Sequence, residues 1–89
     1  MEFEWDPHKA RTNLRKHRID FAEAATVFED YHSVTIVEED PNEQRYATIG
    51  TDALGRTLVV IYTVRAGRIR IISARRATRR ECADYEKGL

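Results

Sequence analysis

The segment RIRIISARRATRRE, from Arg68 to Glu81, concentrates residues that bind anions. Six of its fourteen positions are arginine and only the last is acidic, although the whole chain has a formal net charge of +0. The planar guanidinium group of arginine carries paired N–H donors that match two phosphate oxygens. The segment is therefore a candidate phosphate-binding element.

The point where this segment changes from strand to helix strengthens that prediction. RIRIISAR begins with the alternation of a strand, and Thr78 and Glu81 match the T-x-x-E capping box that starts a helix. Free backbone N–H groups at a helix N-terminus attract anions. The plainer alternative is a solvated strand face, with the arginines of the helix paired to acidic residues of the same helix.

A second group of polar residues has helical spacing near the N-terminus. Lys9, Asn13, Lys16 and His17 recur at intervals that would place them near one face of a helix. Lysine, amide and imidazole groups together could hold a phosphate, and an imidazole can move a proton near neutral pH. Outward-facing lysines are also ordinary on a short helix, so this pattern alone leaves both interpretations open.

The helices that would position these groups can be predicted from capping residues and apolar spacing. The segment FEWDP starts extended, and Asp6 and Pro7 then suit the start of a helix through HKARTNLRKH. Ala10 and Leu14, four residues apart, are expected to face the core of that helix. Asp20 begins the capping signal of a second helix through FAEAATVF.

From Ser33 onward the apolar period changes to two, which indicates strands. Four are expected, with the sequences SVTIVEE, RYATIGTD, TLVVIYTV and RIRIISAR, and the short turns between them favour an antiparallel meander. In the fourth strand Ile72 breaks the alternation, which predicts a bulge or burial on both faces. The expected fold class is α+β in a single domain of residues 1–89: two N-terminal helices, a four-stranded antiparallel sheet and a C-terminal helix that begins near Thr78.

The composition narrows the class of protein. Residues 21–57 carry two basic and eight acidic side chains, whereas residues 58–89 carry eight basic and three acidic ones, so one face could serve polyanions. No apolar run approaches the roughly 18 residues of a membrane span, and no signal region is evident, so we expect a cytoplasmic protein that does not contact the membrane. The single Cys82 and the lack of ligand spacing argue against a disulfide, a metal site or a cofactor.

These segments resemble a known family. FEWDPHKARTNLRKHRIDFAEAATVF near the start, Glu43 and Arg45 before the second strand, and RIISARRATRRE near the end are similar to the BrnT toxins of bacterial type II toxin–antitoxin pairs. The combination of W-D-x-x-K-x-x-x-N-x-x-K-H with I-S-A-R-x-A is the specific part, and the resemblance extends over nearly the whole chain.

The resemblance implies a compact RelE-like fold and a ribonuclease that cleaves RNA and inhibits translation. It also implies a neutralising BrnA-like antitoxin with a ribbon-helix-helix part, and operator DNA would be contacted only through that antitoxin. A homodimer within the toxin–antitoxin complex and an RNA substrate on the ribosome are both compatible with it.

Metal-free cleavage of RNA uses the 2′-hydroxyl of the substrate as nucleophile, so the enzyme supplies a base, an acid and cations that stabilise the phosphorane. The expected members of the site are Arg65, Arg75 and Arg76 as phosphate stabilisers; Lys9, His17 and Glu43 as proton carriers, in an order left open; and Arg45, Arg68, Arg70, Arg79, Arg80, Asn13 and Lys16 as further RNA contacts. The alternative is a non-catalytic RNA-binding or protein-interaction module that uses the same arginine cluster. A DNA-binding regulator is disfavoured, because the arginines lie at a strand end and not on a recognition helix.

Overall fold

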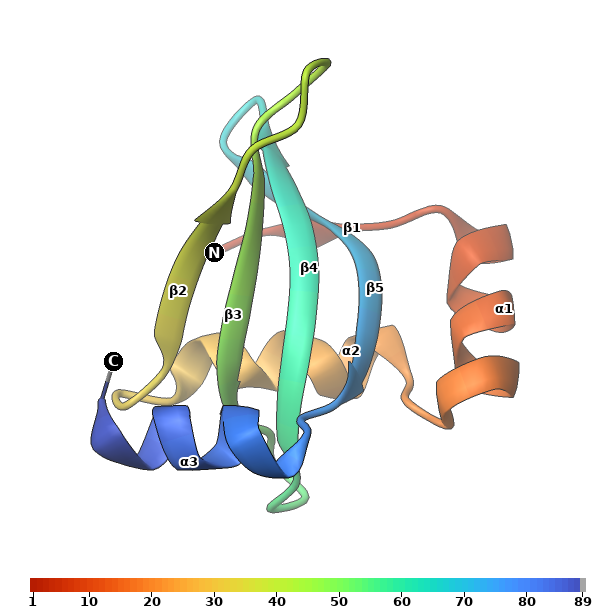
Figure 1. Cartoon of the computed structure of the whole chain (residues 1–89). Helices are drawn as coiled ribbons and strands as arrows, with labels where there is room; N and C mark the ends of the chain where they lie inside the picture. The colour runs from red at the N-terminus through yellow and green to blue at the C-terminus, as the bar shows by residue number, and fades with distance from the viewer. Residues whose placement is uncertain (89) are drawn as a thin grey trace.

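The computed structural model describes residues 1–88 (Figure 1). The α+β class is confirmed, while the predicted sheet and second helix need correction. In chain order the elements are β1 (Phe3–Glu4), α1 (Pro7–His17), α2 (Phe21–Ala24), the 3₁₀ helix η1 (Ala25–Glu29), β2 (Val34–Glu38), β3 (Arg45–Thr51), β4 (Thr57–Arg65), β5 (Arg68–Arg76) and α3 (Arg79–Lys87).

The sheet has five strands in the spatial order β1-β5-β4-β3-β2. Strands β2 to β5 form the predicted antiparallel meander. The prediction of a four-stranded antiparallel sheet was wrong, because Phe3–Glu4 adds to the sheet parallel to β5. A two-residue strand is too short to show alternation, and its pairing depends on a free edge of β5 that the local sequence does not reveal.

The second helix is shorter than predicted. Asp20 caps it as expected, and its side chain accepts a hydrogen bond from a backbone N–H at 2.8 Å. Only Phe21–Ala24 is α-helical, and Ala25–Glu29 continues as a 3₁₀ helix. The β-branched Thr26 bonds through its hydroxyl to the carbonyl three residues earlier, at 2.6 Å. Such local bonds compete with the helical ladder and are consistent with the change of helix type.

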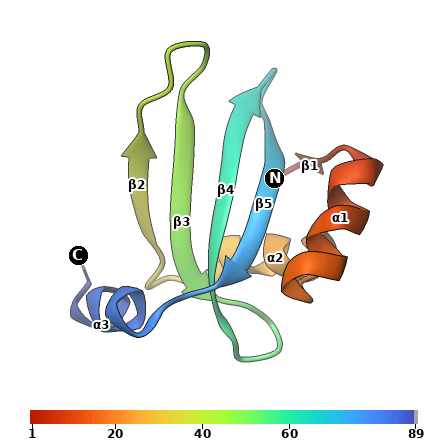
Figure 2. The ribbon, with the colours of Figure 1, turned by 45° about the vertical axis from the view of Figure 1, so that its right-hand side comes forward.

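Helices α2 and η1 cover one face of the sheet, where most of the core lies (Figures 1 and 2). Phe21 and Val27 from the helices pack with Leu58, Val60 and Ile71 from the strands, and all five side chains are buried. Burying side chains of this size stabilises the fold by about 1.5–3 kcal/mol each. This layer holds β4 and β5 in place, and β5 is the strand that carries the arginines of the segment from Arg68 to Arg76.

The opposite face of the sheet carries a smaller core and is open at one end. Ala47, Ile49 and Val59 pack there with Tyr85 of α3. The Tyr85 hydroxyl donates to the carboxylate of Asp30 at 2.5 Å and ties α3 to the end of η1. Helix α3 crosses only the lower end of this face, which we call the open face (Figure 2).

A β-bulge interrupts β5 at Ile72, as predicted. Residues 61 and 62 of β4 pair with residues 73 and 71 of β5, so Ile72 has no partner on β4. A bulge bends its strand and changes the direction of the side chains that follow. Beyond it, Ser73 and Arg75 share the open face with their partners Ile61 and Val59.

Candidate functional site

Helix α1 presents a basic surface beside β5. No acidic residue occurs from position 7 to position 19, which hold five lysines and arginines and two histidines. The Asp6 side chain accepts from the His8 N–H at 2.8 Å, Pro7 occupies the first turn, and Arg18 ends the helix in the left-handed region at φ 61°. The basic last turn complements the helix dipole.

The inward face of α1 differs from the prediction. Leu14, expected to face the core, is 45% exposed, so that prediction was wrong. Ala10 packs against the core as expected, while Asn13 is only 6% exposed. Successive helical positions are about 100° apart, so the helix is rotated by roughly one residue from the predicted orientation. A polar residue therefore occupies the centre of the contact with β5.

Asn13 joins α1 to β5. Its amide nitrogen donates to the carbonyls of Ile19 at 3.0 Å and Ala74 at 2.9 Å, and its amide oxygen accepts from the Ala74 N–H at 3.1 Å. Both N–H donors of the amide are thus used by the backbone. Asn13 therefore positions α1 along the edge of β5, and its contact with RNA stays a prediction.

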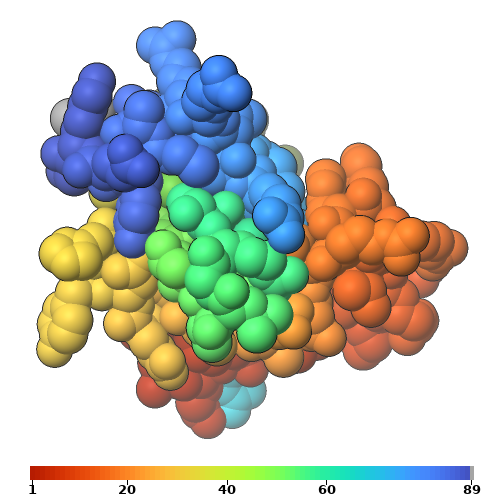
Figure 3. Space-filling view, turned by 90° about the horizontal axis from the view of Figure 1, so that it is seen from below, coloured from red at the N-terminus to blue at the C-terminus, as the bar shows by residue number. Residues whose placement is uncertain are grey.

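A groove of about 310 Å³ lies between α1 and the bulge of β5, and we call it the α1–β5 groove. A second hollow shares His8, Thr12 and Lys16 with it and reaches Arg15. In the view from below, a notch separates the end of β5 and α3 from α1 (Figure 3). The groove is lined by His8, Lys9, Thr12, Asn13, Lys16, His17, Ile72 and Ser73.

The groove brings together four of the predicted residues, Asn13 among them, and adds His8, Thr12 and Ser73, which were not predicted. Lys9, Lys16 and His17 line it as their spacing indicates. His8 and Thr12 could have been found from their four-residue spacing with Lys16, which places them on one strip of the helix. Ser73 could not, because its direction depends on the bulge.

Arg75 lies two residues beyond Ser73, which lines the groove, on the same face of β5, so the two Cα atoms are about 7 Å apart. Its Nη1 and Nη2 donate to the two carboxylate oxygens of Glu81 at 2.7 and 2.9 Å. These bonds lower the pKa of Glu81 to about 2 and raise that of Arg75 above its ordinary value. Glu81 also completes the predicted capping box with Thr78.

The pair with Glu81 leaves half of the Arg75 guanidinium available. Nη1 also donates to the Arg76 carbonyl at 3.3 Å, but among residues 1–88 no acceptor is bonded to Nε. The Nε–H and one Nη2–H form the side edge of the guanidinium plane, a second fork that can hold two phosphate oxygens. Glu81 therefore orients Arg75 without consuming its capacity to bind an anion.

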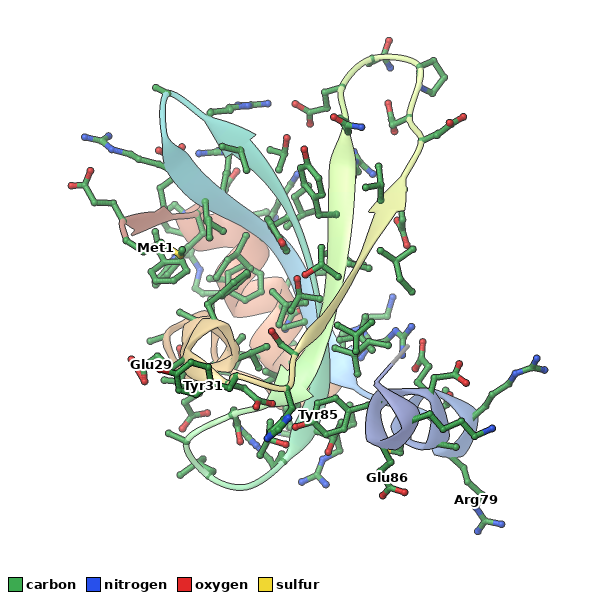
Figure 4. The ribbon with its side chains drawn as sticks, turned by 90° about the vertical axis from the view of Figure 1, so that its left-hand side faces the viewer. Met1, Glu29, Tyr31, Arg79, Tyr85 and Glu86 are labelled. Carbon is green, nitrogen blue, oxygen red and sulfur yellow. The ribbon has the colours of Figure 1, made fainter. Side chains whose placement is uncertain are left out.

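Three other arginines surround this junction. Arg76, Arg79 and Arg80 are exposed, and within residues 1–88 none of them forms an ion pair. Arg79 projects from α3 into the solvent (Figure 4). The alternative in which the helix arginines pair with acids of α3 therefore does not describe this structure; the arginine that pairs with Glu81 is Arg75.

The remaining predicted residues lie at the other end of the sheet. Arg65 donates to Glu43 at 3.2 Å, and Arg45 approaches Asp40 at 3.8 Å. Val59 is the partner of Arg75 and lies six residues before Arg65 on β4, a distance of about 20 Å along the strand. The five predicted catalytic residues thus fall into two groups: Lys9, His17 and Arg75 at one end, Glu43 and Arg65 at the other. One phosphate cannot contact both groups.

The two arginines at the start of β5 are neutralised by β1 and its flank. Arg70 pairs with Glu4 at 2.8 Å, and Arg68 pairs with Glu2 at 3.5 Å and Glu4 at 3.9 Å. The sequence analysis did not anticipate this, because the parallel pairing of β1 is what brings these glutamates alongside. As RNA contacts, Arg68 and Arg70 are weaker candidates than the residues of the α1–β5 groove.

The structure gives two further limits. Among residues 1–88, no group of three His, Cys, Asp or Glu side chains is arranged to hold a metal ion. No helix in that range is long and apolar enough to cross a membrane.

The fold is a small α+β domain, and its basic groove beside a sheet edge is typical of proteins that bind phosphate groups. The sequence matches the family model described as "Ribonuclease toxin, BrnT, of type II toxin-antitoxin system" over residues 5–81, and the chain belongs to this family. The crystal structure of the Brucella abortus ribonuclease toxin BrnT is similar, with a TM-score of 0.65 and 27% sequence identity over 89% of this chain and 99% of that one. No curated protein matches the sequence.

Membership of this family makes the chain a toxin of a type II toxin–antitoxin system, with an antitoxin as its partner. The two segments that carried the resemblance lie far apart in the sequence, yet they meet at Asn13 and Ala74. Both segments line or border the α1–β5 groove. The structure therefore directs attention to this groove within a fold that is shared by the family.

Proposed function

We propose that this toxin is a metal-independent endoribonuclease whose cleavage site is the α1–β5 groove. The observation that carries the proposal is that Lys9, Lys16 and His17 share one groove with Ser73, two residues before Arg75, whose second fork bonds to no acceptor among residues 1–88. The groove thus combines a group that can move a proton with cations that can hold a phosphate. None of these groups depends on a metal ion.

In this mechanism the 2′-oxygen of the substrate forms a bond to phosphorus, and the bond from phosphorus to the 5′-oxygen breaks. His17 takes the proton of the 2′-hydroxyl, and Lys9 or a water molecule returns one to the leaving oxygen. Arg75 and Lys16 stabilise the negative charge of the phosphorane. The products are a 2′,3′-cyclic phosphate and a 5′-hydroxyl, so atoms and charges balance.

Several wider properties belong to the same proposal. Cleavage of messenger RNA would inhibit translation in the cytoplasm, on free RNA or on the ribosome. The partner is a BrnA-like antitoxin with a ribbon-helix-helix part, and operator DNA is bound through that antitoxin only. The family and the similar Brucella toxin support this proposal at the level of a ribonuclease toxin and an antitoxin.

The test is cleavage of end-labelled RNA by the antitoxin-free protein in excess EDTA. We expect cleavage to persist in EDTA, to fall by on the order of 10²–10⁴-fold in His17→Asn, and to fall at least tenfold in Lys9→Ala. The RNA affinity of His17→Asn should change less than threefold, because a proton carrier acts mainly in the transition state.

Two matched variants serve as controls. Arg11→Ala removes a charge from the same helix outside the groove, and His32→Asn removes an exposed imidazole near α3. Both should cleave RNA within about twofold of the unchanged protein. Equal losses in all four variants would mean that total charge and not the groove matters, and loss of cleavage in EDTA would exclude a metal-independent reaction.

The second candidate function is a non-catalytic RNA-binding or protein-interaction module. Exposed, unpaired Arg76, Arg79 and Arg80 would favour it, since binding alone needs only accessible cations. It predicts RNA binding with a steep salt dependence, similar losses of affinity for each arginine removed, and no cleavage either of free RNA or on translating ribosomes.

A further inference from the structure

The outer edge of β2 is unpaired. β2 is the last strand of the sheet, and no element of residues 1–88 pairs with its outer side. Nothing covers it in the two ribbon views (Figures 1 and 2), and in the view from that side it lies in front of the sheet (Figure 4). An exposed edge presents a row of N–H and C=O groups to which another extended chain can bond.

The opposite edge of the sheet, at β5, is protected, in contrast to the unpaired edge at β2. There β1 pairs with the first part of β5, and the side chain of Asn13 takes the backbone groups of Ala74 further along. β2 has five residues and lacks proline and lysine, the residues that commonly block edge pairing. The chain therefore protects one edge and leaves the other available.

Both faces of β2 are apolar where the edge is open. Ile36 is 52% exposed on the open face, and Val37 is 51% exposed on the face toward η1. Val34 begins the strand beside a hollow of about 450 Å³ that Tyr31 and Tyr85 also line. An added strand would bury apolar side chains on both sides, as the alternation of a strand requires.

An apolar groove of about 380 Å³ lies beside the same edge on the face toward η1. Thr35 of β2 lines it together with Tyr46, Tyr62 and Val64 of the neighbouring strands. Side chains of an added strand that point toward this face would extend into it. The groove extends from the edge strand β2 across β3 and β4 to Ile69 of β5.

The charges around β2 are acidic. Glu38 ends the strand, and Glu39 and Asp40 follow it directly; in residues 21–57 as a whole, eight acidic side chains face only two basic ones. Of the nearby cations, Arg45 already lies 3.8 Å from Asp40. A chain that adds to this edge is therefore favoured if basic residues flank its apolar strand.

We infer that β2 is the docking edge for an extended segment of the antitoxin, apolar on alternate positions and flanked by lysine or arginine, which adds to the sheet as a sixth strand. The inference takes the antitoxin from the family of this chain and does not depend on the proposed cleavage reaction. It places the antitoxin on the side of the sheet opposite α1. Neutralisation would then leave the α1–β5 groove uncovered by this contact.

A second copy of the chain fits the edge less well. In an antiparallel pair of two β2 strands, Glu38, Glu39 and Asp40 of each copy would lie beside the start of the other strand. No residue of β2 is basic, so the second copy offers these acids no partner within the strand, whereas a segment flanked by lysine or arginine does. Charge thus favours a basic partner segment over self-association.

The test is hydrogen exchange of the full-length toxin, free and in complex with its antitoxin. We expect alternate amides of residues 34–38 to exchange at least tenfold more slowly in the complex. Ile36→Lys should weaken the complex at least tenfold, whereas Leu54→Lys, which changes an apolar residue 62% exposed in the β3–β4 turn, should leave the affinity within twofold.

Three outcomes would overturn the inference: a complex in which β2 exchanges as fast as in the free toxin, an Ile36→Lys variant with unchanged affinity, or no complex at all. Protection of β2 that appears in the free toxin as its concentration rises would assign the edge to a second copy. RNA cleavage by the free Ile36→Lys variant should equal that of the unchanged protein. Loss of cleavage in all preparations, with β2 protected in the complex, would contradict the proposed function and leave this inference standing.

Discussion

The two ends of the arginine-rich sheet differ in how their cations are used. At the hairpin end, Arg65 and Arg70 are paired with Glu43 and Glu4, residues supplied by other elements. At the α1 end the lysines of the groove have no acidic neighbour within the helix, and Arg75 keeps one fork free beside its pair with Glu81. Positive charge in the sequence therefore indicates a site only where the fold leaves it without a partner.

The largest expected effect separates the two ends directly. Arg75→Ala should reduce RNA cleavage on the order of 10²–10³-fold, because it removes a donor aimed at the charge that develops on phosphorus. Arg65→Ala should retain cleavage within about threefold, since it lies about 20 Å away along the sheet. Single-turnover rates with saturating RNA measure the difference, and the reverse ranking would move the site to the hairpin end.

The second effect concerns the attachment of α1 to β5, the two elements that form the groove. Asn13→Ala leaves the backbone groups of Ala74 and Ile19 without their partner and should destabilise the fold by about 2–3 kcal/mol. In a domain of this size that is a fall in Tm of roughly 10–20 °C. Thermal unfolding measures it, with the exposed Asn42→Ala as the control. A fall of less than about 3 °C would show that α1 is held mainly by other contacts.

The sequence predicted much of the fold because its signals are local. The caps at Asp6, Asp20 and Thr78, the meander and the bulge at Ile72 all depend on residues close together in the chain, and all are present in the structure. Strand β1 was missed as a sheet member because its pairing is supplied by residues more than sixty positions away.

The site could be predicted only in part for the same reason. Helical spacing identified Lys9, Lys16 and His17, which share one groove. Spacing could not show that the Asn13 amide bonds to the backbone of β5. It also could not show that Glu81 pairs with Arg75, or that Glu43 pairs with Arg65 at the opposite end of the sheet. Each of these depends on contacts between distant segments, which decide whether a charged side chain is free or neutralised.

A smaller effect tests the electrostatics of the Arg75–Glu81 pair. The hydrogen bonds that Glu81 accepts from Arg75 hold the pKa of Glu81 at about 2 in the folded state, below the ordinary value of 4.5. The pair therefore contributes its full stability above about pH 4.5 and loses it as the pH falls toward 2. Because Arg75 is 39% exposed, solvent screening reduces the contribution to about 1 kcal/mol.

The comparison uses Glu81→Gln, which keeps an acceptor for the capping box but removes the charge. The unchanged protein should be more stable than the variant by about 1 kcal/mol at pH 7, and the gap should close between pH 4.5 and pH 2. Urea unfolding at several pH values measures the gap. A gap that stays constant over this range would mean that packing and not charge accounts for the pair.

The smallest effect is expected at the hairpin end. Arg65 and Glu43 are 55% and 31% exposed and lie 3.2 Å apart, so solvent screens their attraction. A double-mutant cycle with Arg65→Ala and Glu43→Ala should give a coupling free energy of about 0.2–1 kcal/mol that decreases with added salt. A coupling above about 2 kcal/mol, insensitive to salt, would contradict this view. The pair would then be held at least as tightly as Arg75 and Glu81, and the contrast between the two ends would rest on the free fork of Arg75 and the lysines of α1 alone.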